Sequence, residues 1–111
     1  MSIRVYEIIA AGAVHGHLAR VLAKMAQRRR VSRFCITKGI DCVPTSIICN
    51  NYMRDLQKAC TLSQMGYVDA VVVAGMRGWT ADEKDYFWEM TADSKIKVIN
   101  LDELDCRYLI D

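Results

Sequence analysis

The run from Val68 to Ala74 constrains the fold of this 111-residue chain more than any other segment. After Asp69 it contains only alanine and valine, so polar residues do not alternate with apolar ones. Strands that are apolar on both sides are typical of parallel sheets whose two faces are covered by helices. The run ends in Gly75-Met76-Arg77-Gly78-Trp79, and the sequence therefore predicts a buried strand that opens onto a glycine-containing loop.

The rest of the chain alternates predicted strands with predicted helices. The patterns predict strands over residues 3–11, 34–37, 68–74 and 96–101, and helices over residues 17–29 and 47–65 and from Thr80 onward. Every pair of successive strands is joined by a segment of helical length, which implies right-handed crossovers. We therefore expect one α/β domain over residues 1–111, with a four-stranded parallel sheet in a flavodoxin- or Rossmann-like three-layer sandwich.

Two local patterns define helices within this scheme. In the first helix an apolar stripe is predicted to face the core, with basic residues on the other side; the stripe comprises Leu18, Val21, Leu22 and Met25. Thr80-Ala81-Asp82-Glu83 matches the capping box S/T-x-x-E, in which the two side chains satisfy free amides at a helix start.

Composition narrows the possible partners and the cellular location. The net charge of +2 is small and the basic residues are not interleaved with aromatic ones, so nucleic acid is not favoured as a partner. An apolar fraction of 52% exceeds the usual range, and we expect the excess to be buried in the core or in a homo-oligomer. The chain has no apolar run of about 18 residues and no leader pattern, which predicts a cytoplasmic protein without a membrane partner.

The five cysteines form no CxxC pair, and the nearest two are seven positions apart. That spacing favours reduced thiols over a disulfide framework or a zinc site. His15 and His17 have no third metal ligand nearby in the sequence. We expect neither a metal ion nor a cofactor.

Three loops are predicted to meet at the carboxyl edge of the sheet, where open parallel sheets bind ligands. They comprise residues 12–17, 38–44 and 75–79. In the first, Gly12 and His17 lie where a strand enters a helix, and the free amides of a helix start attract phosphate. The sequence there is not GxGxxG, and the alternative is that the glycines permit a tight turn while a histidine caps the helix.

The third loop carries the side chains best suited to a nucleoside or nucleotide. Trp79 could stack on a base and Arg77 could pair with a phosphate or carboxylate, with Gly75 and Gly78 completing the predicted substrate-binding loop. Downstream, Asp82, Asp85 and Glu89 lie on one stripe of the predicted helix. Such a carboxylate suits glycosidic chemistry as nucleophile or acid/base, and a solvated acidic face is the alternative.

These residues also resemble a known family. Arg54-Asp55-Leu56, the strand 68–73, Gly78-Trp79 and a glutamate ten residues after that tryptophan resemble the nucleoside 2-deoxyribosyltransferase-like superfamily over approximately residues 50–101. The resemblance implies that Glu89 attacks the anomeric carbon or assists hydrolysis, with Asp69 and Trp79 near the base and sugar. Family members usually end the first strand in Tyr-x-Ala-Gly-Pro, whereas this chain has Ile9-Ala10-Ala11-Gly12-Ala13.

The leading hypothesis from the sequence is a nucleoside- or nucleotide-directed protein that cleaves or transfers at an N-glycosidic bond. Its candidate catalytic residues are Glu89, Asp69 and His15, where a histidine would hold the phosphate or protonate the leaving base. A nucleotide-binding or regulatory module without turnover is the first alternative. The second is an interaction protein that uses a face of its long helix, comprising Tyr52, Met53, Leu56 and Met65.

Overall fold

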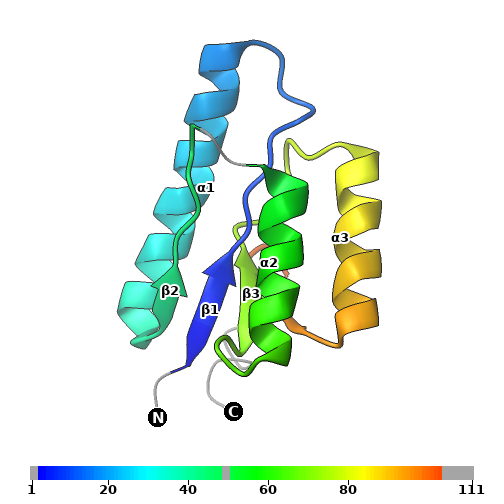
Figure 1. Cartoon of the computed structure of the whole chain (residues 1–111). Coiled ribbons are helices and arrows are strands. Elements are labelled where there is room, and N and C mark those ends of the chain that lie inside the picture. The colour runs from blue at the N-terminus through cyan, green and yellow to red at the C-terminus, as the bar shows by residue number, and fades with distance from the viewer. Residues whose placement is uncertain (1–2, 49–50, 104–111) are drawn as a thin grey trace.

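The computed structural model describes residues 3–48 and 51–103 and contains a four-stranded parallel sheet flanked by helices (Figure 1). In chain order the elements are β1 (Arg4–Glu7), α1 (His17–Lys38), β2 (Asp41–Val43), α2 (Tyr52–Gln64), β3 (Ala70–Val73), α3 (Ala81–Ser94) and β4 (Lys97–Asn100). The strand order is β2-β1-β3-β4, and each neighbouring pair is parallel. The predicted α/β class with a parallel sheet is confirmed.

The helices divide between the two faces of the sheet. On one face, α2 and α3 cover a core that includes Tyr6, Leu56, Val71 and Phe87. On the other face α1 is the one described helix, and it covers a smaller core in which Val31 and Cys35 meet Val72. All four residues of β3 are buried, as the apolar run of the sequence predicts for a central strand.

The predicted strand 34–37 is wrong, because these residues form the last turns of α1. Gly39 ends the helix in the left-handed conformation (φ 66°), and its N–H bonds to the carbonyls of Cys35 and Ile36. The β-branched residues in this segment favour a strand locally, but Cys35 packs on the sheet one turn after Val31, and tertiary packing overrides that preference. The second strand is Asp41–Val43 instead.

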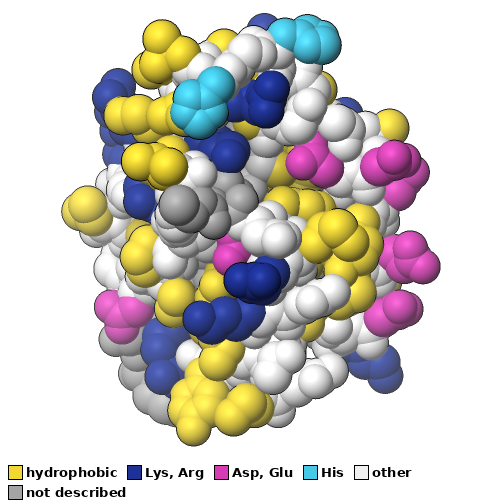
Figure 2. Space-filling model, turned by 45° about the horizontal axis from the view of Figure 1, so that its top comes forward, with side chains coloured by type: hydrophobic (Ala, Val, Ile, Leu, Met, Phe, Trp, Pro, Cys, Tyr) yellow, Lys and Arg dark blue, Asp and Glu magenta, His cyan; other side chains and the backbone are white. Residues whose placement is uncertain are grey.

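The predicted orientation of the first helix is also wrong. Leu18, Leu22 and Met25 are 70%, 55% and 45% exposed, while the buried residues of α1 are Gln27, Val31 and Cys35. With 22 residues α1 is about 33 Å long, whereas a four-residue strand spans about 13 Å. The helix therefore extends past the sheet (Figure 1), and hydrophobic side chains remain at the surface on the side that carries it (Figure 2).

Capping interactions define where the other two helices begin. Asn51 accepts a hydrogen bond from the Arg54 N–H, so α2 starts at Tyr52 rather than near residue 47. Thr80 and Glu83 form the predicted capping box at the start of α3. Both helix starts lie at the carboxyl edge of the sheet, where the candidate site is found.

Candidate functional site

The loops after β1 and β3 lie against each other at the carboxyl edge of the sheet. The Ala13 N–H donates to the Gly78 carbonyl at 3.0 Å, and the Gly12 N–H donates to Glu83 Oε1 at 3.2 Å. A Cβ atom on Gly78 would lie 3.2 Å from the side chain of Val14. This is the switch point at which open α/β sheets usually bind ligands, and here direct contacts between the two loops close it.

The carboxylate of Glu83 connects these loops to α3. Its Oε1 atom accepts from the Thr80 N–H at 2.7 Å within the capping box and from Gly12 in the neighbouring loop. The Glu83 N–H bonds in turn to Thr80 Oγ1 at 3.0 Å. The capping role follows from the sequence, whereas the link to Gly12 requires the two loops to be adjacent in space.

A cleft of about 400 Å³ lies beside this junction, between the first turns of α2 and α3. It is lined by Asn51, Tyr52, Met53, Asp82, Glu83 and Tyr86. The Tyr52 hydroxyl donates to the Glu83 carbonyl, and Gln57 Nε2 donates to the Tyr86 hydroxyl at 3.0 Å. The two tyrosine rings are thereby held with their centroids 6.0 Å apart. The cleft has the size of a small-molecule site, with aromatic walls and a carboxylate-bearing rim.

Trp79 lies beneath the cleft rather than in it. Its side chain is buried and makes edge-to-face contacts with Tyr52 at 5.3 Å and with Phe87 at 5.5 Å between ring centroids. Its Nε1 atom has no hydrogen-bond partner among the described residues. A ring in this position supports the wall of the cleft and has no face free to stack on a ligand.

The predicted catalytic carboxylates do not gather at the cleft. Asp69 lies before β3, at the amino edge of the sheet, where it exchanges hydrogen bonds with the backbone of Arg4 at 2.9 and 2.7 Å. The strand β3 therefore separates Asp69 from Trp79. Glu89 is exposed on α3, three residues past Tyr86, and is not among the residues that line the cleft.

His15, His17 and Arg77 are not among the residues that line the cleft either. His15 and His17 are exposed at the start of α1, and Arg77 is exposed in the loop after β3. The predicted loop 38–44 instead holds the end of α1 at Lys38 and the strand β2 at Asp41–Val43, so it does not form a loop at the carboxyl edge.

Gly75 is held against the segment that follows β4. Its backbone has φ 126°, and a Cβ atom there would collide with the Asp102 carboxylate. Arg30 of α1 pairs with that carboxylate at 2.9 Å and donates to the carbonyl of Ala74. The glycine thus allows the close approach of Asp102, and protein atoms occupy this side of the loop.

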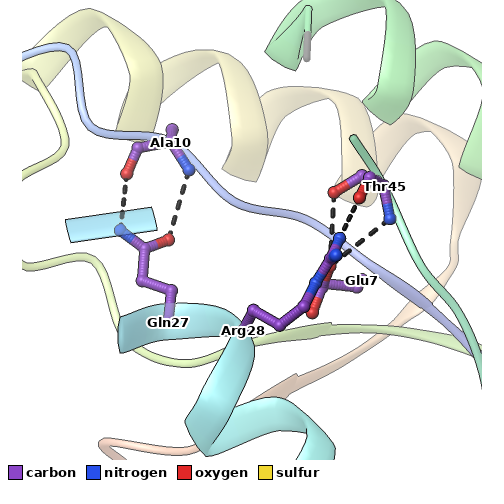
Figure 3. Close-up of polar contacts among 5 residues, drawn as sticks. All are labelled: Glu7, Ala10, Gln27, Arg28 and Thr45. Atoms are coloured by element: carbon purple, nitrogen blue, oxygen red, sulfur yellow. Dashed lines mark hydrogen bonds and ion pairs between the residues drawn. The ribbon is translucent and has the colours of Figure 1, made fainter. Parts of the chain in front are cut away.

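A polar cluster that the sequence did not predict fixes the chain between β2 and α2 (Figure 3). Glu7 is 1% exposed, and its Oε1 atom accepts from Arg28 at 2.8 and 3.1 Å and from the Thr45 N–H and hydroxyl at 3.3 Å. Arg28 also donates to the carbonyl of Thr45. The sequence holds two signals for this cluster: a carboxylate in a buried strand and the arginine run of α1. Glu7 and Arg28 are 21 residues apart, so these signals do not reveal that the two side chains meet.

Asp55 is a second carboxylate that the sequence did not assign to the site. Burial raises its pKa above the ordinary value, against the opposing effect of Lys58 and Arg54. Its Oδ2 atom has no hydrogen-bond partner in the described part of the chain. Asp55 lies three residues after Tyr52, on the same side of α2 and one turn away from the cleft.

The described residues contain neither a metal-ligating cluster nor a membrane-spanning helix. Within residues 3–48 and 51–103, no group of three or more His, Cys, Asp and Glu side chains could hold a metal ion. No helix in those ranges is long and apolar enough to cross a membrane. Cys35, Cys42 and Cys60 are free thiols, while Cys49 and Cys106 lie outside the described residues.

No family model matches the chain, and comparisons with curated proteins and with solved structures find no significant match.

Proposed function

We propose that this protein binds a nucleoside in the cleft between α2 and α3. One observation carries the proposal: two tyrosine rings and two acidic residues line a cleft of about 400 Å³ at the carboxyl edge of a parallel sheet. Planar bases pack well on aromatic rings, and carboxylate oxygens accept hydrogen bonds from sugar hydroxyls.

The charge of the lining favours a nucleoside over a nucleotide. Asp82 and Glu83 are both acidic, and the six lining residues include no lysine or arginine. Repulsion between these carboxylates and a phosphate would weaken nucleotide binding in a partly desolvated cleft. Arg77 and the two histidines, which the sequence suggested for phosphate, lie outside the lining.

Cleavage or transfer at the N-glycosidic bond is the second candidate function. Asp82 supplies a carboxylate in the cleft itself, and Asp55, whose pKa is raised by burial, lies one turn of α2 away as a second candidate acid/base group. The resemblance to the nucleoside 2-deoxyribosyltransferase-like superfamily points to the same chemistry through Glu89. Chromatography of nucleosides incubated with the protein tests this function, because free base appears only if the bond is broken.

The binding proposal is tested by thermal unfolding with purine and pyrimidine nucleosides and their 5′-monophosphates. At a nucleoside concentration of about 100 Kd the expected stabilisation is about 2.7 kcal/mol, and the monophosphates should stabilise less. Tyr86→Ala should abolish the shift, whereas Glu89→Gln, outside the cleft, should preserve it. Unfolding that is insensitive to every nucleoside would refute the proposal.

Asp82→Lys provides a second test that does not depend on removing a packed ring. Asp82 is exposed at the start of α3, so the change leaves the core intact. The variant should bind monophosphates more tightly than the wild type does, relative to the parent nucleosides. An unaltered preference would place the ligand away from this rim.

Turnover is separated from binding by comparing three variants at carboxylates: Asp82→Asn, Asp55→Asn and Glu89→Gln. Release of free base by the wild type but not by Asp82→Asn or Asp55→Asn would assign catalysis to the cleft. Loss of release in Glu89→Gln alone would support the residue implied by the family resemblance. Binding without release would establish a module that holds a nucleoside and leaves its bond intact.

A further inference from the structure

The outward side of α1 carries an apolar stripe that no described element covers. It comprises Leu18, Leu22, Met25 and Ile36, with exposed fractions from 45% to 81%. Their separations of four, three and eleven residues place them on one side of the helix, opposite the buried Gln27 and Val31. We call these four residues the α1 stripe.

The surroundings of the α1 stripe are basic. The helix contains no Asp or Glu, and its charged residues are Arg20, Lys24, Arg28, Arg29, Arg30, Arg33 and Lys38. Arg29 lies within the stripe, four residues after Met25, and Arg33 lies at its border; both are exposed. Alanines at positions 19 and 26 flank the stripe and would let another helix approach closely.

The outward side of α3 has complementary properties. Trp88 is 41% exposed and lies in line with Ala81, Asp85 and Ala92, at separations of four, three and four residues. Its acidic neighbours Glu89 and Asp93 are also exposed, as is the basic Lys84, and α3 as a whole carries five acidic residues against this one lysine. Figure 2 shows several acidic side chains along the side of the molecule that carries α3. We call Ala81, Asp85, Trp88 and Ala92 the α3 seam.

We propose that the α1 stripe of one molecule docks on the α3 seam of a second copy. The indole of Trp88 would pack between Leu22 and Met25, and Arg29 would face Asp85. Two α1 stripes packed on each other would instead bring like charges together, because the helix has no acidic residue to offset Arg29 and Arg33. Opposite charge on the two surfaces therefore favours the α1–α3 contact.

The geometry predicts how such an assembly grows. A contact between two different surfaces is heterologous, so each added molecule leaves one α1 stripe and one α3 seam unoccupied. Assembly then continues into chains or closes into a ring. Because charge contributes to the contact, the association should weaken as salt is raised.

The experiment measures molar mass by sedimentation against protein concentration, for the wild type and two variants. Leu22→Glu disables the α1 stripe and Ala92→Arg disables the α3 seam; both positions are exposed, and circular dichroism checks the fold. Each variant alone should be monomeric under conditions in which the wild type associates. Mixed in equal amounts they should form a dimer and nothing larger, since each retains the surface that the other lacks.

Several outcomes would overturn the proposal. A wild type that stays monomeric at millimolar concentration refutes it, and so does a mixture of the two variants that remains monomeric. Dimerisation of Ala92→Arg alone would show that α1 pairs with α1 instead. As a charge test, Arg29→Glu should weaken association at least tenfold, and adding Asp85→Lys to it should restore association. None of these substitutions alters a residue of the cleft lining, so the nucleoside proposal stands or fails separately.

Discussion

Both hydrogen bonds made by the side-chain amide of Gln27 go to the backbone of Ala10. Gln27 Nε2 donates to the Ala10 carbonyl at 2.7 Å, and the Ala10 N–H donates to Gln27 Oε1 at 3.3 Å (Figure 3). Ala10 lies three residues beyond the end of β1, and the chain there is still buried. Buried backbone groups need hydrogen-bond partners. The amide of Gln27 supplies both partners for the backbone of Ala10, as a neighbouring strand does for the backbone of β1.

Replacing Gln27 with leucine should therefore destabilise the protein. The substitution leaves the N–H and carbonyl of Ala10 buried without their partner, at a cost of about 1–3 kcal/mol. Urea unfolding measures the change, and Gln64→Leu, at an exposed position of α2, serves as the matched control. Equal midpoints for the two variants would contradict this role.

Glu7 and Arg28 should behave as a coupled pair. Glu7 is buried and Arg28 is 30% exposed at its side chain, so Glu7→Gln removes charge from a largely desolvated interaction. We expect a loss near the lower end of the range for broken buried pairs, about 3 kcal/mol. In a double-mutant cycle, Arg28→Met should cost clearly less in the Glu7→Gln background than in the wild type. Additive losses would show that the two side chains act independently.

Asp55 should make stability depend on pH. Its folded pKa is raised by burial, so the proton is held more tightly in the folded state, and the resulting stability is lost as pH rises through that pKa. Asp55→Asn removes this loss and should be more stable than the wild type at pH 7. The advantage should shrink as the pH falls toward about 3.9, the ordinary value for aspartate. Unfolding curves across this range check it, and a constant or growing advantage would contradict it.

Gly75→Ala should destabilise through two separable effects. The positive φ angle strains any residue with a Cβ, at a cost of about 1–3 kcal/mol, and the new methyl group also displaces the Asp102 carboxylate. In an Asp102→Ala background the second effect disappears and only the strain remains. Thermal unfolding of the single and double variants measures both parts, and a cost that vanishes entirely in that background would exclude backbone strain.

Features that depend on neighbouring residues alone were predictable from the sequence. The apolar run of β3 and the capping box of Thr80 and Glu83 are both found where the pattern places them. The side of α1 that faces the sheet was not predictable in this way. Leu18, Leu22 and Met25 form a regular amphipathic pattern, but α1 turns that side away from the sheet and packs Gln27, Val31 and Cys35 inward instead.

The candidate site was predicted in its general location and not in its members. Residues that follow a parallel strand lie at the carboxyl edge, and the cleft is found at that edge beside the loop after β3. Trp79 occupies the core because its ring fills the space between Tyr52 and Phe87, which are distant in sequence. The role of Glu7 was not predictable from the sequence, because its partners, Arg28 and Thr45, are 21 and 38 residues away along the chain.

Three closely spaced side chains of α1 reach fixed acceptors on other parts of the chain. Gln27 bonds to Ala10, Arg28 to Glu7 and Thr45, and Arg30 to Ala74 and Asp102. Apolar contact is non-directional and would let a helix slide or roll on a sheet, whereas hydrogen bonds demand fixed distances and angles. These hydrogen bonds therefore fix the position of α1 on the sheet. They set both its translation along the helix axis and its rotation about that axis.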